Sequence, residues 1–289
     1  MVLNPGSGSG VDEAAGRQIV ELFAAQGREA TIFAAAAGST VADQARAAAE
    51  ARCRLVVAAG GDGTVNAVAA AAIERELPLA VLPTGTLNHF AKDLGLPLEL
   101  AEAVRIAAQG VVRRVDVGEV NGRIFLNNSS IGVYPRVVEF RNRYGGQGAA
   151  KWLAAAWASL AVLRRRPFVG VRIRTGDEVT VRRTPFVFIG NNEYRMVGLR
   201  AASRESLTGG KLALYVMHAS RRRSLLGLAW QVLWRGVDQV EELECLTVVE
   251  AEVETRRHRL QVALDGEVVV LESPLIYRSR PAALQVLAP

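Results

Sequence analysis

The chain has 289 residues, half of them hydrophobic, which excludes global disorder and leaves room for two domains with separate cores. The formal net charge of +6 favours anionic partners, but no interleaving of basic and aromatic residues points to nucleic acid. The two cysteines are too few for a disulfide framework and match no metal spacing, so we expect a reducing, cytoplasmic setting.

Helices and strands alternate through the first part of the chain. The apolar periodicity predicts helices at 11–26, 39–51, 62–75, 86–94 and 98–109, between strands at 1–4, 30–34, 54–59 and 79–82. Such alternation is typical of a doubly wound α/β fold, which we assign to a first domain over residues 1–117.

Strands dominate from about residue 112 onward. Two helices are predicted, at 149–164 and 221–235, among strands at 112–121, 123–130, 168–175, 177–183, 185–190, 211–217, 243–250, 251–256, 258–264 and 267–271. Periodicity alone supports only a β-rich second domain, which we place at 118–275.

The most informative turn follows the apolar run 55–59, which is typical of a buried strand. Gly60 and Gly61 end this strand, and a helix begins at Asp62, so backbone N–H groups are offered to an anion such as phosphate. A carboxylate there would repel phosphate unless a cation lies between them or the carboxylate binds a ribose hydroxyl. Asp62 therefore points to a nucleotide and to Mg²⁺. The alternative is a plain strand–turn–helix with Asp62 as the cap.

The same succession of strand, glycine-containing turn and helix occurs twice more. The apolar strand 79–82 runs into a Pro/Gly/Thr turn, where Thr84, Gly85 and Thr86 offer N–H and hydroxyl donors, and the strand at the start of the chain runs into residues 4–10. Adjacent parallel strands place such turns at one edge of the sheet, where ligands bind in doubly wound folds. Asn88 follows the Pro/Gly/Thr turn, and it could contact a ligand or cap its own helix. We weigh these two roles equally.

Five segments carry a resemblance to a known family: Asn4-Pro5-Gly6-Ser7-Gly8, Gly60-Gly61-Asp62-Gly63-Thr64, Pro83 to Lys92, Phe125 to Gly132, and Ala263-Leu264-Asp265-Gly266-Glu267. In order and spacing they resemble the diacylglycerol kinase catalytic domain family of bacterial lipid kinases, over nearly the whole chain. The second segment alone is shared with NAD kinases, whereas its combination with the third and fifth is much more specific.

The resemblance implies a β-sandwich second domain that accepts the lipid, a C-terminal tail (about 276–289) that returns to the first domain, and reacting groups held between the domains. It implies transfer of the γ-phosphoryl group of Mg·ATP to a lipid hydroxyl, most simply that of diacylglycerol. The candidate nucleotide-binding residues are Asn4, Ser7, Gly8, Gly60, Gly61, Asp62, Gly63, Thr64, Asn66, Thr84, Gly85, Thr86 and Asn88.

The resemblance also supplies the candidate catalytic carboxylates. It makes Asp265 the general base that accepts the hydroxyl proton, with Glu267 as the next candidate or as a residue that orients the site. From the residues alone, the hairpin turn that Asp-Gly favours is the first interpretation of Asp265-Gly266, and the resemblance reverses that order. Asp116 matches an acidic residue near the family's site, and its alternative is a turn at a strand edge.

Departures from the family limit the metal assignment. His89 stands where the family often has Asp, and Ser9 where it sometimes has Lys. The family's metal-binding loop is rich in Asp, but here residues 208–213 read Thr-Gly-Gly-Lys-Leu-Ala. We therefore predict no structural metal in 208–213, and assign Mg²⁺ only to Asp62 through Mg·ATP.

Membrane contact is expected to be peripheral. No signal-peptide pattern opens the chain, and its longest apolar stretch, 152–163, is too short to span a bilayer. The predicted helices 149–164 and 221–235 carry Trp and Leu at helical spacing beside Arg triplets, a pattern typical of core packing or of a membrane surface. An NAD kinase-like enzyme and a non-catalytic nucleotide- or lipid-binding regulator are the alternative functions. The sequence leaves a homodimer open.

Overall fold

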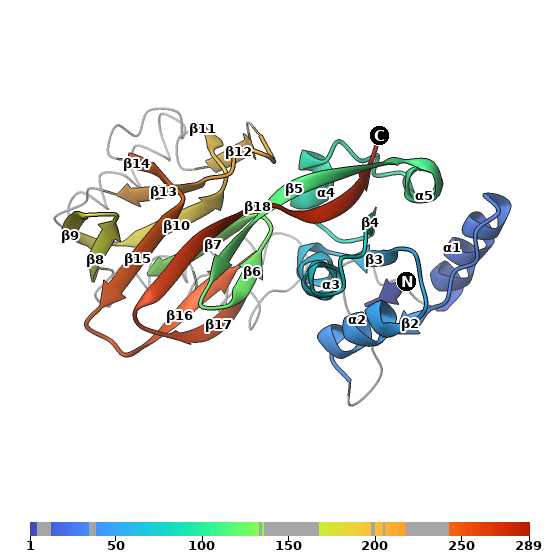
Figure 1. The fold of residues 1–289 in the computed structure, drawn as a ribbon, viewed down its shortest axis with the longest axis horizontal. Coiled ribbons are helices and arrows are strands. Elements are labelled where there is room, and N and C mark those ends of the chain that lie inside the picture. Colours follow the sequence, from blue (N-terminus) through green and yellow to red (C-terminus); the bar gives the residue numbers. More distant parts are fainter. Residues whose placement is uncertain are drawn as a thin grey trace, which may run out of the picture. The chain divides into compact units, whose positions relative to one another are not determined.

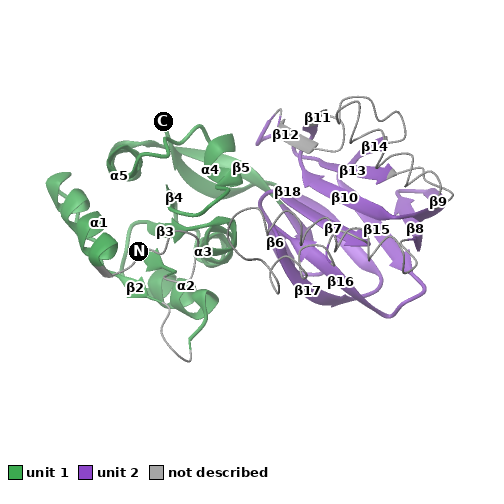
Figure 2. Cartoon of the chain, turned by 180° about the vertical axis from the view of Figure 1, so that it is seen from behind, with its two compact units in different colours: residues 1–117, 281–289 green, residues 118–280 purple. Residues whose placement is uncertain are grey.

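The structure is a computed structural model that describes residues 1–4, 13–34, 39–132, 135, 168–197, 200–204, 206–217 and 243–289 (Figure 1). The chain divides into two compact units, 1–117 with 281–289 and 118–280 (Figure 2). The chain passes from one unit to the other twice, and the sequence analysis predicted these two crossings at 117/118 and at about 275/276. Both crossings of the structure fall inside strands, β5 (Val111–Val120) and β18 (Leu275–Ala288).

Unit 1 is built on a parallel sheet with the described strand order β2-β1-β3-β4-β18. Its strands are β1 (Val2–Leu3), β2 (Phe33–Ala34), β3 (Val56–Gly60) and β4 (Leu79–Pro83), joined at Val286 by β18. Its helices are α1 (Glu13–Ala25), α2 (Val41–Glu50), α3 (Asp62–Glu74), α4 (His89–Asp93) and α5 (Leu100–Gln109).

Both faces of this sheet are covered because its central strands are apolar throughout. Val57 and Leu82 belong to a cluster with residues of α1 and α5, while the alternating residues of β3 and β4 are also buried, on the side where α3 packs. Helices on both faces confirm the doubly wound α/β prediction.

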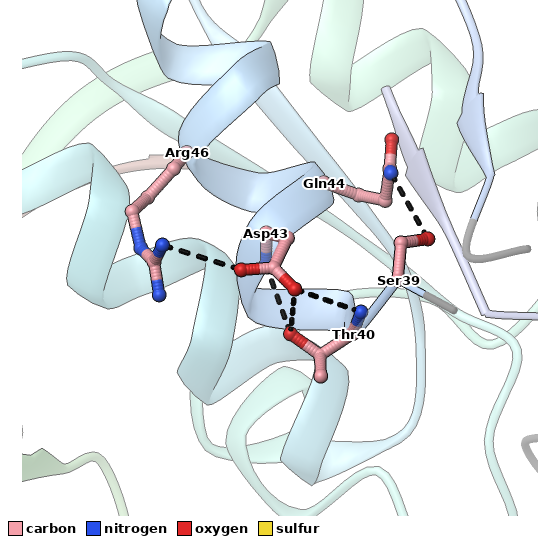
Figure 3. Close-up of polar contacts among 5 residues, drawn as sticks. All are labelled: Ser39, Thr40, Asp43, Gln44 and Arg46. Atoms are coloured by element: carbon pink, nitrogen blue, oxygen red, sulfur yellow. Dashed lines mark hydrogen bonds and ion pairs between the residues drawn. The ribbon is translucent and has the colours of Figure 1, made fainter.

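Helix α2 begins with a capping box (Figure 3). The Asp43 backbone N–H donates to the Thr40 hydroxyl at 3.1 Å, and the Asp43 carboxylate accepts from the Thr40 N–H at 2.9 Å, which satisfies two N–H groups at the helix start. Gln44 donates to Ser39, and Arg46 pairs with Asp43 at 3.2 Å. The hydrogen bond from Thr40 lowers the pKa of Asp43.

Unit 2 contains two packed sheets. The described strand order is β14-β13-β10-β7-β16-β17 in one sheet and β18-β15-β8-β9 in the other, where β5 pairs with β6. The strands are β6 (Arg123–Phe125), β7 (Asn128–Gly132), β8 (Val169–Thr175), β9 (Glu178–Thr184), β10 (Phe186–Asn191), β13 (Leu212–Met217), β14 (Leu243–Val248), β15 (Glu250–Thr255), β16 (Arg259–Leu264) and β17 (Glu267–Glu272).

One apolar cluster fills the space between the two sheets of unit 2. Ile173 and Tyr277 come from one sheet, and Ile131 and Ile189 come from the other. Phe125 packs edge-on against Tyr277, with ring centroids 6.3 Å apart. Packing of two sheets around a shared core confirms the predicted β-sandwich.

The structure corrects three strand predictions. The predicted strand 123–130 is two strands, β6 and β7, interrupted at Leu126 and Asn127. The hairpin of β11 (Tyr194–Val197) and β12 (Arg200–Arg204) was not predicted, and neither was the long strand β18. The predicted helices 149–164 and 221–235 lie outside the described residues. Within the part of the chain that the structure describes, no helix is long and apolar enough to cross a membrane.

Candidate active site

The turn after β3 opens helix α3 at Asp62, as predicted. Gly61 occupies the N-cap position, and as a glycine it has no side-chain oxygen to cap the N–H groups of the first helical turn. The turn after β4 packs directly against it, because a Cβ atom on Gly85 would lie 2.3 Å from the Cα of Gly61. Two of the glycine turns are thus brought into contact at one edge of the sheet.

Asn88 organises the turn between β4 and α4. Its side-chain oxygen accepts the Gly85 N–H at 3.0 Å, and its amide donates to the carbonyl oxygens of Pro83 and Gly85 at 3.1 and 2.8 Å. Asn88 has φ 51° and makes no capping bond to helix α4. The capping alternative for Asn88 is therefore wrong. Its side chain instead bridges the backbone of Pro83 and Gly85 within the turn.

Asp62 joins the two turns. Its carboxylate accepts the backbone N–H groups of His89 and Phe90 at 3.3 and 3.2 Å, so it caps the start of α4, which lies in the neighbouring turn. The alternative of a capping Asp is thus realised, although on another helix. The half-buried carboxylate therefore sits where the turns after β3 and β4 meet.

The third glycine turn contributes Asn4, whose side-chain amide donates to the buried Thr64 hydroxyl at 3.2 Å. Ser7 and Gly8 lie outside the described residues. Asn66 is half-buried one turn along α3 from Asp62, whereas Thr86 is exposed. Unit 1 therefore gathers Asn4, Gly60 to Thr64 and Thr84 to Asn88 at the carboxyl ends of β1, β3 and β4.

In unit 2, Asp265 and Gly266 form the two-residue turn between β16 and β17, with φ 47° and 86°. The hairpin alternative is thus correct for the backbone. The Asp265 carboxylate nevertheless has a second role, because Oδ2 accepts the Leu126 N–H at 2.7 Å and Oδ1 accepts the N–H groups of Asn127 and Asn128 at 2.8 and 3.0 Å. These three bonds fix the carboxylate and end strand β6 at Phe125.

Glu267 follows this turn as the first residue of β17. Its side chain reaches solvent, but burial of the carboxyl and, second, the charge of Asp265 raise its pKa. The two carboxylates therefore differ in environment: backbone N–H groups hold Asp265, whereas partial burial and the charge of Asp265 favour the protonated form of Glu267.

Asp116 lies inside strand β5, which contradicts the alternative of a turn at a strand edge. It is 2% exposed, and its Oδ1 atom accepts the N–H of Ala282 at 2.8 Å. Ala282 has φ 52° in the middle of β18. The Asp116 carboxylate therefore fixes the point at which β18 enters unit 1.

The loop 206–211 is organised by neutral groups. The Asn192 N–H donates to the Lys211 carbonyl at 2.9 Å, a Cβ on Gly209 would lie 2.7 Å from the Asn192 side-chain oxygen, and Ser206 pairs with Thr208 at 3.2 Å. Among the described residues no cluster of three His, Cys, Asp or Glu side chains could hold a metal ion.

The sequence analysis did not predict a cluster of buried polar side chains that bond to the backbone of residues 126–128. Arg204 of β12, Asn191 of β10 and Tyr194 of β11 all bond to backbone carbonyls of this segment. The sequence contains one sign of this cluster, because the polar pair Asn191-Asn192 directly follows the apolar predicted strand 185–190. Arg204 had no such signal, because a lone arginine in a polar stretch resembles a surface residue.

Two family models match the chain. The model "Diacylglycerol kinase catalytic domain" matches residues 1–120, and the model "YegS C-terminal NAD kinase beta sandwich-like domain" matches residues 127–288. Together they cover both units. The first includes the glycine turns, and the second includes the Asp265 turn and more than half of the chain.

Individual relatives agree with these models. The protein of Chromohalobacter salexigens named "Probable lipid kinase YegS-like" is 32% identical over 85% of this chain and 79% of its own length. The diacylglycerol kinase of Bacillus subtilis is 35% identical over 44% of this chain, and the match spans only 43% of that enzyme.

Solved structures show the same fold. A crystal structure of a diacylglycerol kinase from Bacillus anthracis str. Sterne has a TM-score of 0.69 at 19% identity, covering 100% of this chain and 95% of that one. A second structure from that strain has a TM-score of 0.75 at 22% identity, covering 100% and 96%. The family membership rests on the two family models and the Chromohalobacter relative: the chain belongs to the lipid kinase family that combines the diacylglycerol kinase catalytic domain with a YegS-type β-sandwich domain, a family of phosphotransferases with an alcohol acceptor.

Proposed function

We propose that the protein is an ATP-dependent lipid kinase that transfers the γ-phosphoryl group to a lipid hydroxyl, most simply that of diacylglycerol. One observation carries the nucleotide part of the proposal. Asn4, which follows β1, bonds to Thr64 in the turn after β3, and the turns after β3 and β4 meet through the Gly61–Gly85 packing and the bonds of Asp62 to α4. These contacts support the proposal of a single phosphate-binding edge.

Mg²⁺ suits this edge. The glycine turns are packed so closely that Gly85 has no room for a side chain, and the backbone can therefore approach phosphate oxygens directly. Asp62 brings a carboxylate to the same edge and would hold Mg²⁺ together with the nucleotide phosphates. When bound, Mg²⁺ neutralises charge on the phosphates. The residues themselves bind and orient the nucleotide.

On the acceptor side, we assign proton acceptance to Asp265. The hydroxyl oxygen forms a bond to the γ-phosphorus, the bond from phosphorus to the β–γ bridging oxygen breaks, ADP leaves, and the hydroxyl proton passes to the carboxylate. In phosphoryl transfer most of the catalysis comes from positioning and charge stabilisation, so a rigidly held carboxylate suits the task better than a mobile one. The three N–H groups of residues 126–128 provide that rigidity.

The decisive experiment supplies labelled ATP and Mg²⁺ with a panel of lipids in mixed micelles and in anionic vesicles at low and high salt. We expect a phosphorylated lipid, and Asp265→Asn should lower kcat by roughly 10²–10⁴ with little change in the KM for ATP. Turnover should rise on anionic vesicles and fall with salt if the enzyme works at a membrane surface in the cytoplasm. Arg221 to Arg223, the Arg triplet of the predicted helix 221–235, lie outside the described residues.

The same assay with NAD added as an acceptor, together with an ATP titration, separates the alternatives. Phosphorylation of NAD but of no lipid would make the protein an NAD kinase-like enzyme. Tight ATP binding without turnover on any acceptor would make it a regulator. Either result would overturn the proposed function.

A further inference from the structure

Segment 126–128 has two sides with different partners. Its three N–H groups all donate to the Asp265 carboxylate. On the other side, the Leu126 carbonyl accepts from the Arg204 guanidinium at 2.5 Å and from the Asn191 amide at 2.9 Å. The Asn127 carbonyl accepts the Tyr194 hydroxyl at 3.1 Å and the Asn191 N–H at 2.9 Å. The segment is therefore held from both sides.

One peptide unit links the two charged residues. The Leu126 carbonyl and the Asn127 N–H belong to the same planar trans peptide and point in opposite directions. Arg204 binds the carbonyl end, and Asp265 binds the N–H end. The cation faces the negative end of the peptide dipole and the anion faces the positive end, so each charge strengthens the hydrogen bond that the other makes.

Arg204 is itself firmly held. It is 9% exposed, its second terminal nitrogen donates to the Asn127 side-chain oxygen at 3.2 Å, and its guanidinium carbon lies 5.9 Å from the centre of the Tyr194 ring. A guanidinium can donate to two oxygens in one plane while stacking on a ring, which the ammonium of lysine cannot do. The position therefore favours arginine over lysine.

We propose that Arg204 is a positioning residue for the catalytic turn: it acts on Asp265 through the peptide unit between Leu126 and Asn127 and without touching substrate. The proposal rests on the proposed function, since it takes Asp265 as the proton acceptor. It adds a residue to the machinery that none of the family motifs in the sequence contains.

Kinetics with Arg204→Met, Arg204→Lys and the control Arg259→Met test this role. Arg259 lies on β16 of the same sandwich but is exposed and paired only loosely with Glu272, at 3.5 Å. We expect Arg204→Met to lower kcat by roughly 10- to 100-fold with an unchanged KM for ATP, because a small displacement of a reacting group has that effect. Arg204→Lys should recover part of the loss, and Arg259→Met should match the wild type.

A double-mutant cycle shows whether the effect passes through Asp265. In an Asp265→Asn background, Arg204→Met should lower kcat by less than about threefold, because residues that act as a unit are not additive. The same fold loss in both backgrounds would overturn the proposal, and so would an Arg204→Met variant with wild-type kcat. If Arg204→Met does not fold, Arg204→Lys decides: its kcat must lie below that of the wild type.

Amide hydrogen exchange gives a readout that needs no activity. Exchange at Leu126, Asn127 and Asn128 should speed up in the Arg204 variants and stay unchanged in Arg259→Met. Unchanged exchange in every Arg204 variant would overturn the proposal. If the wild type phosphorylates no lipid, the proposed function fails, and the exchange measurement alone decides whether Arg204 holds the segment.

Discussion

Asp62 caps helix α4 with the same two oxygen atoms that would hold Mg²⁺ in the proposed function. As an acceptor for the His89 and Phe90 N–H groups it stabilises the start of α4, and as a carboxylate at the phosphate edge it is the candidate partner of Mg²⁺. Alanine would remove both roles together. Asparagine keeps one acceptor oxygen and loses the charge, so it separates them.

We therefore expect Asp62→Asn to weaken binding of Mg·ATP by roughly 10- to 100-fold, the equivalent of a lost interaction with a charged group. Its melting temperature should fall less than that of Asp62→Ala, which loses the cap entirely. Nucleotide titration and thermal melts measure the two effects. Asp177→Asn, at an exposed hairpin tip in unit 2, is the control. Wild-type affinity in Asp62→Asn would remove Asp62 from the nucleotide site.

Glu267 should reduce stability at neutral pH. Burial and the Asp265 charge raise the pKa of its carboxyl in the folded state, so the protonated form is favoured by folding. The stabilisation from the protonated Glu267 carboxyl is complete below its pKa in the unfolded chain. It is lost as pH rises through its raised pKa in the folded protein. Glu267→Gln, which stays neutral, should therefore raise the melting temperature at pH 7 and leave it unchanged at acid pH.

Glu178→Gln is the matched control for this measurement. Glu178 also follows a two-residue hairpin turn, between β8 and β9, and is exposed. Its variant should melt like the wild type at both pH values. Equal gains in both variants would mean that removing any surface carboxylate stabilises this basic protein and that Asp265 has no special effect on Glu267.

The sequence analysis could predict only those site features whose residues are neighbours in the sequence. The glycine turns were visible because a strand, a turn and a helix start are neighbours in the sequence. The bonds of Asp62 to His89 and of Asp265 to Leu126 join distant residues, and only the packing of strands brings those pairs together. The same reason explains why Arg204 was missed: nothing near it in the sequence records its buried partners.

At the scale of elements, three helices of unit 1 end in the same way. After α1, α3 and α4, the first residue beyond the helix cap has a positive φ. The backbone N–H of the next residue then donates to a carbonyl oxygen in the last turn of the helix. The residue of positive φ is Gly27 with φ 69° after α1 and Gly95 with φ 72° after α4, but it is Glu76 with φ 54° after α3. A side chain is strained in this conformation, whereas glycine is not.

Glu76→Gly should therefore stabilise the protein by roughly 0.5–1 kcal/mol, the relief of strain less the added freedom of the unfolded chain. Gly27→Glu should destabilise it by a similar amount, because open space around Gly27 leaves backbone strain as the only cost. Chemical denaturation of the pair checks both signs. A less stable Glu76→Gly protein would show that the exposed Glu76 side chain stabilises the native state.

Most elements of unit 1 were predicted to within a few residues because each buries a periodic apolar face. The failure at 123–130 has a physical cause. Its residues have the pattern of one strand, but the N–H groups of Leu126 and Asn127 bond to Asp265 and not to a neighbouring strand. Strand β18 was missed because Pro281 and the mixed residues around it interrupt the alternation, although a returning tail was expected from the resemblance.

At the scale of the whole molecule, unit 1 depends on a segment far from the rest of its sequence. Residues 281–289 include Leu284, Val286 and Ala288, each fully buried, and Val286 pairs with Leu79 of β4. Deleting 281–289 should expose the edge of β4 and abolish the cooperative unfolding of unit 1, while the sandwich of unit 2 keeps its own core. Deleting Pro289 alone, which is exposed, is the control.

Calorimetry and hydrogen exchange of α3 amides measure the outcome. In the shortened protein we expect a lost transition and fast exchange in α3, and partial recovery when the peptide 281–289 is added. A shortened protein whose unit 1 melts as before would show that β1 to β4 form a stable sheet by themselves.

The return of β18 to unit 1 also fixes an order of events during synthesis. The ribosome makes residues 1–117 first, yet the nascent sheet lacks a strand until residues 281–289 have emerged. Unit 2 is complete earlier, once residue 280 is available. The part of the chain made first should thus be the last to reach its native state, and its half-built sheet edge is the surface that chaperones would have to shield meanwhile.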